Sequence, residues 1–233
     1  MKKERHMVDY ITSNSSGAGT SPGTPVVWHY DVISPFAYLA LPAVEALARQ
    51  RPVLFRPIVL GAVLSHWGQL GPAEIAPKRL HTYRLCQFLA ERAGMAFRFP
   101  PKHPFRSLDA LRLLTALHGH PDAVRDTFAF IWAEGRDFSD PAERDALCSR
   151  LGVDDYEALV AKTDAKNQLR LWTEEAIANG VFGVPTLAVG GELFWGLDAM
   201  PMAEAYLADS SLLTRGEMAR LANLPTGVGR RIG

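Results

Sequence analysis

Cysteine is scarce in this 233-residue chain, which has only Cys86 and Cys148. The two form neither a CxxC pair nor any spacing typical of metal ligands, so no metal site is predicted. A disulfide framework of the kind that holds small secreted proteins together is excluded, and the scarcity favours a reducing compartment. We expect two structural thiols in a cytoplasmic protein.

An excess of charge of one sign is also missing, because 25 Lys and Arg residues balance 25 Asp and Glu residues. No overall field therefore attracts nucleic acid or an acidic membrane surface, and a charged ligand must be held by local groups. No apolar run approaches the ~20 residues of a membrane-spanning helix, and the N-terminus lacks the apolar core of a signal peptide. We expect neither nucleic acid nor membrane as a partner.

Hydrophobic residues make up 48% of the chain, which is enough for a sizeable core. Residues 1–25 are too polar and glycine-rich to pack, and they predict a flexible tail. After the tail, apolar patterns predict a strand at Val26–Tyr30, a helix from Pro35 to Arg49 and a second strand at Val53–Leu60. This order predicts a right-handed βαβ unit with parallel strands.

A long helical region follows, with no convincing strand from Gly61 to about Thr186. We predict an all-helical insertion over residues 63–179. A Gly190-Gly191 turn then predicts a hairpin that returns through Glu192–Trp195, and a closing helix spans Met200–Leu207. Residues 180–209 would complete the domain begun by residues 26–62, and residues 210–233 form an extension.

Two features stand at the openings of regular elements. Pro35 suits the first position of a helix, which makes Ser34 the N-cap. A hydroxyl there faces unsatisfied backbone N–H groups and can meet an anion or a thiolate, although it can equally serve as a cap alone. Far downstream, Pro185 opens a strand, and we predict a cis Val184–Pro185 bond. A βαβ half, a helical insertion and a cis-proline ββα half predict an α/β, thioredoxin-like fold with a large all-helical insertion.

Several motifs carry a resemblance to a known family. They are Asp31-x-x-Ser34-Pro35-x-x-Tyr38, Ser107-Leu108-x-Ala110-Leu111-Arg112, Gly135-Arg136-Asp137, Gly180-Val181-Phe182-Gly183-Val184-Pro185-Thr186 and Gly191-Glu192-Leu193-Phe194-Trp195-Gly196. Together they resemble the 2-hydroxychromene-2-carboxylate isomerases, which are related to kappa-class glutathione transferases within the DsbA-like group. The resemblance covers about residues 26–207. It implies a homodimer that binds a small-molecule substrate.

The two positions that hold a CxxC pair in redox members of this fold are Ser34 and Ala37 here, which excludes thiol–disulfide exchange at this site. The thiol must then arrive with a ligand. The resemblance implies that this ligand is glutathione, with its sulfur near the catalytic Ser34 and its cysteinyl main chain paired with Val184. A thiolate would add to the conjugated enone of an aromatic acid, permit rotation about the bond and leave again.

Other candidates surround these positions. Asp31 can orient Ser34 or bond nearby backbone N–H groups, and Tyr38 can reach the pocket or pack in the core. Where the family has an asparagine, a tyrosine and an arginine, this chain has Gln69, His81 and Ala199. The glutathione-binding candidates are Val184, Pro185, Asp198, Lys78, Gln69 and Leu197, and the substrate-binding candidates are Tyr38, Asp31, His81, Trp67 and Trp195.

Three functions remain open at this point. The first is a glutathione-dependent isomerase of an aromatic or enone carboxylic acid. The second is a kappa-like glutathione transferase or peroxidase, and the third is a thioredoxin-like binding protein without catalysis. His66, His81 and His103 lack metal-ligand spacing, so each is expected on a loop or a helix surface.

Overall fold

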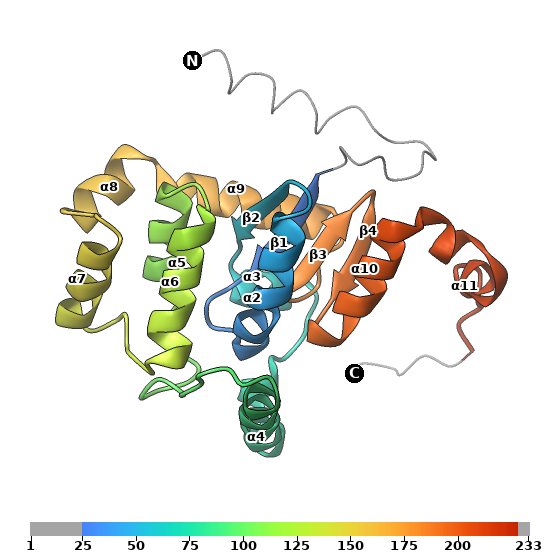
Figure 1. Ribbon diagram of the computed structural model, residues 1–233, viewed down its shortest axis with the longest axis horizontal. Helices are drawn as coiled ribbons and strands as arrows, with labels where there is room; N and C mark the ends of the chain where they lie inside the picture. Colours follow the sequence, from blue (N-terminus) through green and yellow to red (C-terminus); the bar gives the residue numbers. More distant parts are fainter. Residues whose placement is uncertain (1–24, 228–233) are drawn as a thin grey trace, which may run out of the picture.

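The computed structural model describes residues 25–227, so the predicted tail lies almost wholly outside the described residues. One four-stranded sheet has the order β2-β1-β3-β4 (Figure 1). Strand β1 (Val26–Tyr30) runs parallel to β2 (Val53–Pro57), whereas β3 (Thr186–Val189) is antiparallel to both β1 and β4 (Glu192–Trp195). The βαβ unit and the hairpin are therefore confirmed.

Aromatic side chains on one face of β1 anchor the core. Trp28 and Tyr30 are fully buried, and their rings stack at 4.6 Å between centroids. Both rings also pack against Phe128, which belongs to the helical region. Because strand residues two apart share a face, this pair joins the sheet to the helices in one core.

The second strand ends at Pro57 and not at Leu60, which corrects the predicted strand boundary. The N–H of Ile58 makes the last bond to β1, to the carbonyl of Tyr30 at 2.8 Å. The N–H of Leu60 is taken instead by a carboxylate oxygen of Asp31 at 3.0 Å. Helix α3 (Leu60–His66) begins at that residue.

Helices fill the chain between the two strand pairs (Figure 1). Helix α2 (Pro35–Ala48) connects β1 to β2. The elements after α3 are a 3-10 turn (Pro72–Glu74), α4 (Ala76–Arg92), α5 (Leu108–Ala116), α6 (Pro121–Phe128), a π-helical turn (Ala129–Ala133), α7 (Pro141–Arg150), α8 (Tyr156–Lys162) and α9 (Ala165–Ala178). Asp140 before Pro141 is a pattern that predicts the start of a helix, and Asp140 caps α7 by accepting a hydrogen bond from the N–H of Ala142 at 2.9 Å.

After β4 the chain forms a 3-10 turn (Leu197–Ala199), α10 (Met200–Ala208), a second 3-10 turn (Ser210–Thr214) and α11 (Gly216–Leu221). Helix α11 lies at the far end of the molecule from α7 and α8 (Figure 1). No helix within residues 25–227 is long and apolar enough to cross a membrane. The architecture is the thioredoxin-like α/β fold expected from the sequence, while the division at residues 62/63 and 179/180 stays a prediction.

Candidate functional site

The turn after β1 and the loop before β3 meet at one end of the sheet. In the antiparallel β1–β3 pair, His29 lies opposite Thr186, so the exit from β1 is beside the entry to β3. The exit leads into Ser34, and the entry passes through the Val184–Pro185 bond, which is cis as predicted. The fold thus brings together the two features that stand far apart in the sequence.

Ser34 is the N-cap of α2, as its sequence predicts. Its backbone is extended, with φ −89° and ψ 114°, and its hydroxyl oxygen accepts a hydrogen bond from the N–H of Ala37 at 3.3 Å. The side chain is 6% exposed. Because the oxygen only accepts in this contact, the hydroxyl proton remains available to a ligand at the positive end of the helix.

The carboxylate of Asp31 holds the Ser34 turn from within. It accepts hydrogen bonds from the N–H groups of Ile33 and Leu60, each at 3.0 Å. Burial raises the pKa of Asp31 to about 6, although these bonds and one from the Ser107 hydroxyl act in the opposite direction. The geometry shows the predicted bonds from Asp31 to nearby backbone N–H groups. Its substrate-binding role stays a prediction.

Two side chains from the helical region hold the same turn from outside. The indole N–H of Trp132 donates to the carbonyl of Val32 at 2.8 Å. Nε2 of His103 lies 2.9 Å from the carbonyl of Ile33, to which only a ring N–H can donate, and Nδ1 lies 2.8 Å from the hydroxyl of Tyr83. The carbonyls of Val32 and Ile33 thereby have fixed partners.

His103 lies in the loop between α4 and α5, which is one of the two places expected for it. Its ring is partly buried against Trp132, with 5.5 Å between ring centroids, and burial lowers its pKa. The neighbouring Phe99 and Phe105 pack around the same indole. Nothing local in the sequence indicated its partner Ile33.

Tyr38 lies in the core. Its hydroxyl donates to the carbonyl of Ala96 at 2.8 Å, its ring stacks on Phe97, and the residue is 8% exposed. Burial raises the pKa of the Tyr38 hydroxyl. Its hydroxyl thus connects α2 to the segment after α4 by a hydrogen bond. The predicted contact of Tyr38 with substrate stays a prediction.

The loop before β3 is shaped by Trp195. A side chain at Gly183 would collide with the Trp195 indole, so only glycine fits there without movement of the ring. Trp195 is 51% exposed and rests edge-on against Phe182. No hydrogen bond among residues 25–227 uses the main-chain N–H or C=O of Val184. Both groups are therefore free to pair with an extended ligand.

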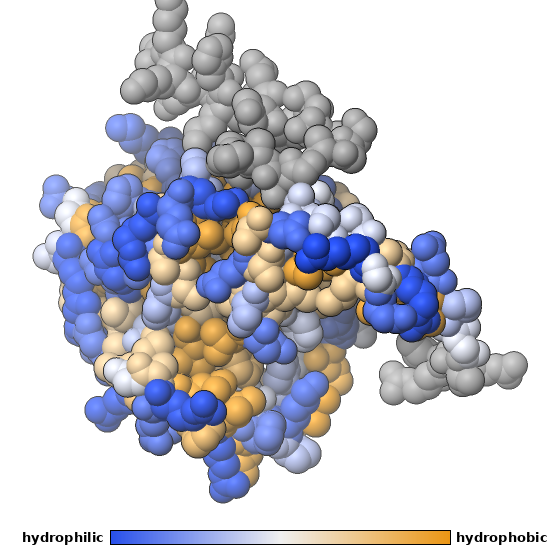
Figure 2. Space-filling model, turned by 45° about the vertical axis from the view of Figure 1, so that its right-hand side comes forward, coloured by the Kyte–Doolittle hydropathy of each residue, from blue (hydrophilic) through white to orange (hydrophobic). Residues whose placement is uncertain are grey.

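The remaining candidates, here called the rim, are mostly exposed on the surface. Trp67 is 44% exposed and donates to the carbonyl of Val181 at 2.9 Å, which ties the end of α3 to the loop before the cis bond. Leu197 is partly buried against the core. The side chains of Gln69, Lys78, His81 and Asp198 are exposed and form no hydrogen bond or ion pair within the described part of the chain. Figure 2 shows apolar side chains gathered on the lower half of one face, the half that holds α4.

The cysteines take no part in this site. Both are buried free thiols, and burial raises the pKa of Cys86 to about 12. A thiol with such a pKa is protonated at neutral pH and is not a nucleophile. Within residues 25–227 no cluster of His, Cys, Asp and Glu is suited to a metal ion.

Residues 25–208 match the family model of the DSBA-like thioredoxin domain. The chain belongs to this family. It is 28% identical to a 2-hydroxychromene-2-carboxylate isomerase of Sphingobium xenophagum over 190 residues, which cover 78% of this chain and 97% of the relative. It is 27% identical to glutathione S-transferase kappa 2 of Caenorhabditis elegans, over 79% of this chain and 92% of the relative.

A solved structure of a 2-hydroxychromene-2-carboxylate isomerase superposes with a TM-score of 0.67 at 25% identity, covering 87% of this chain and 100% of the other. The resemblance drawn from the sequence motifs is thus confirmed by both sequence and structure. The relationship is to isomerases and glutathione transferases, which indicates that this DSBA-like protein is an enzyme.

Proposed function

We propose that this protein is a glutathione-dependent isomerase of an aromatic or enone-containing carboxylic acid. The observation that carries the proposal is a buried hydroxyl, that of Ser34, at the N-terminus of α2 and at the same sheet end as a cis-proline loop. The turn has no thiol of its own, because positions 34 and 37 are serine and alanine. The named isomerases and kappa transferases among its relatives support the same assignment.

The site suits a thiolate that arrives on a ligand. Helix N-termini lower the pKa of a nearby thiol, which is about 8.5 in free cysteine. The Ser34 hydroxyl still has its proton to donate, and the main-chain groups of Val184 are without partners among the described residues. These two features fit the sulfur and the peptide backbone of glutathione respectively.

The exposed rim supplies groups for the charged ends of the tripeptide. Lys78 is suited to a carboxylate of glutathione or substrate, Gln69 to a neighbouring peptide group and Asp198 to the γ-glutamyl ammonium. Leu197 adds apolar contact beside Asp198, and His81, Trp67 and Trp195 would contact the substrate. When bound, glutathione supplies a thiolate that adds reversibly to a conjugated double bond, so that the substrate can rotate about it before the thiolate leaves.

The test measures both the bound thiol and the reaction. In the wild type, the pKa of the glutathione thiol, followed by the ultraviolet absorbance of the thiolate, falls below its value in free solution, and 2-hydroxychromene-2-carboxylate is isomerised. Ser34→Ala raises that pKa towards the free value, because only the helix N-terminus remains to lower it, and lowers kcat about 100-fold. Asp140→Ala is the control, because it removes the N-cap of α7 away from the site. Full activity of Ser34→Ala would contradict the role of Ser34.

A kappa-like glutathione transferase or peroxidase is the second candidate, supported by the kappa relatives. The two are separated by stoichiometry: the isomerase consumes no thiol, whereas a transferase consumes one per electrophile. A protein that fails to bind millimolar glutathione in calorimetry would be the third candidate, a thioredoxin-like binding protein.

A cytoplasmic homodimer remains the expected form, and sedimentation of the full chain measures its assembly.

A further inference from the structure

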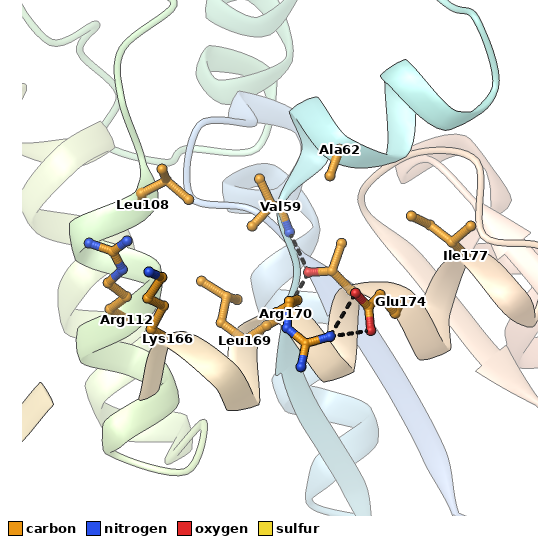
Figure 3. Close-up of a pocket in the computed structure, with 10 residues that line it drawn as sticks. Val59, Ala62, Leu108, Arg112, Lys166, Leu169, Arg170, Glu174 and Ile177 are labelled. Atoms are coloured by element: carbon orange, nitrogen blue, oxygen red, sulfur yellow. Dashed lines mark hydrogen bonds and ion pairs between the residues drawn. The ribbon is translucent and has the colours of Figure 1, made fainter. Parts of the chain in front are cut away.

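A separate groove lies between α3, α5 and α9 (Figure 3). Its volume is about 230 Å³, larger than the ~150 Å³ apolar cavity that accommodates one benzene. The floor is apolar and is made by Val59, Ala62, Leu108, Leu169 and Ile177. None of these residues is among the candidates for the glutathione site.

The charges around the groove are unequal. Arg112 is paired with Asp109 at 3.1 Å, and Arg170 holds both carboxylate oxygens of Glu174 at 2.7 and 2.9 Å. Lys166 forms no ion pair within the described residues. The groove therefore contains one unpaired positive charge and no unpaired negative charge.

The positive and apolar groups occupy opposite ends. Figure 3 shows Arg112 and Lys166 side by side at one end, next to Leu108, whereas Ala62 and Ile177 lie at the other. Thr173 adds no free polar group to the floor, since its hydroxyl donates to the carbonyl of Leu169 and accepts from the N–H of Val59. A complementary ligand has an anion at one end and an apolar body.

We propose that this groove binds a small apolar monocarboxylate, with the carboxylate on Lys166 and Arg112 and the apolar body on Val59, Leu169 and Ile177. A single aromatic ring bearing one carboxylate matches the volume and the polarity. Because much of the groove is open, binding is weak and of millimolar affinity, and it is strongest at low ionic strength. The proposal does not depend on the reaction at Ser34.

Methyl resonances separate this groove from the Ser34 site. In the full chain labelled at isoleucine methyl groups, benzoate shifts the Ile177 signal, whereas glutathione shifts that of Ile33, the residue before Ser34. Benzamide, which has the same shape without the charge, binds about tenfold more weakly than benzoate. Inorganic phosphate, an anion without an apolar body, shifts Ile177 little.

The variant Lys166→Met keeps the length of the side chain and removes its charge, so it weakens benzoate about tenfold. Lys162→Met is the matched control, an exposed lysine on α8 outside the groove, and it leaves the affinity unchanged. The proposal is overturned if benzoate shifts Ile33 and not Ile177, or causes no shift. It is equally overturned if benzamide or phosphate binds as well as benzoate, or if the two variants behave alike. Loss of the glutathione response alone would contradict only the proposed function.

Discussion

The turn before Ser34 and the exposed rim candidates differ in how they are held. Between Asp31 and Ser34 the carboxylate and two carbonyl groups have partners from β2's exit, the segment after α4 and the π-helical turn. On the rim, Gln69, Lys78 and Asp198 have no side-chain partner within residues 25–227. One region is fixed by several parts of the fold, and the other is free to adapt.

This difference separates two requirements of a site. A hydroxyl that stabilises a developing charge must be positioned before the substrate arrives, because reorganisation would cost part of the stabilisation. Groups that recognise the ends of a ligand can be exchanged without disturbing the fold. Of the three positions where the resemblance implies a departure from the family pattern, Gln69 and His81 are exposed rim residues, whereas Ala199 is partly buried.

The largest effect is expected at the buried carboxylate. Asp31→Ala leaves the N–H groups of Ile33 and Leu60 without an acceptor, which lowers the free energy of unfolding by about 3 to 5 kcal/mol. Denaturant unfolding measures the loss. Asp198→Ala, an exposed aspartate on the rim, should change stability by less than about 0.5 kcal/mol. Equal losses in the two variants would remove the contrast between turn and rim.

The same carboxylate makes stability depend on pH. The pKa of Asp31 is raised by burial from 3.8 to about 6, so the folded state binds a proton that the unfolded state has released. Stability from this group is therefore present at low pH and lost as pH rises from about 4 to about 7. Relative to Asp31→Asn, the wild type should lose about 3 kcal/mol over this range, measured by denaturant unfolding at each pH. A constant difference would show that Asp31 titrates normally.

A smaller loss of stability is expected when the hydrogen bond from Trp132 to the turn is removed. Trp132→Phe removes the N–H that donates to the carbonyl of Val32 and leaves that buried acceptor unpaired, at a cost of about 2 kcal/mol. Trp28→Phe is the matched control, because the indole N–H of Trp28 is buried without a partner among the described residues. Thermal unfolding of both variants should show the smaller loss for Trp28→Phe.

The smallest effect on stability is expected on the rim. Lys78→Ala should leave the free energy of unfolding within about 0.5 kcal/mol of the wild type and weaken glutathione about tenfold by calorimetry. Lys102→Ala, which is also exposed, should change neither quantity. If Lys78→Ala binds glutathione as tightly as the wild type, Lys78 contacts no carboxylate of the ligand.

Local patterns were sufficient for much of this fold. Alternation and apolar runs predicted β1, β3 and β4, and the Ser34-Pro35 and Asp140-Pro141 pairs predicted where helices begin. The cis Val184–Pro185 bond also followed from a proline at the opening of a strand. In each case the determining interaction lies within a few residues along the chain.

The failures depend on distant partners. Beyond β2, the N–H of Leu60 bonds to Asp31, which follows the neighbouring strand β1 and lies 29 residues away. The roles of His103 and Trp132 arise from carbonyl groups 70 and 100 residues away. The sequence left undecided whether the Tyr38 side chain lies in the pocket or in the core, because nothing local reveals Ala96 as its partner. Such pairs become visible only once the sheet and helices are packed together.

The unequal exposure of the tryptophans gives the protein a built-in optical reporter. Trp28 and Trp132 are fully buried, whereas Trp67 and Trp195 are about half exposed and flank the Val181–Pro185 loop. An ionic quencher such as iodide would therefore reduce the emission of the latter pair more than that of the buried pair, with the partly buried Trp172 in between. Shielding from iodide would report occupancy of this loop in the unlabelled native chain, without a chromogenic substrate.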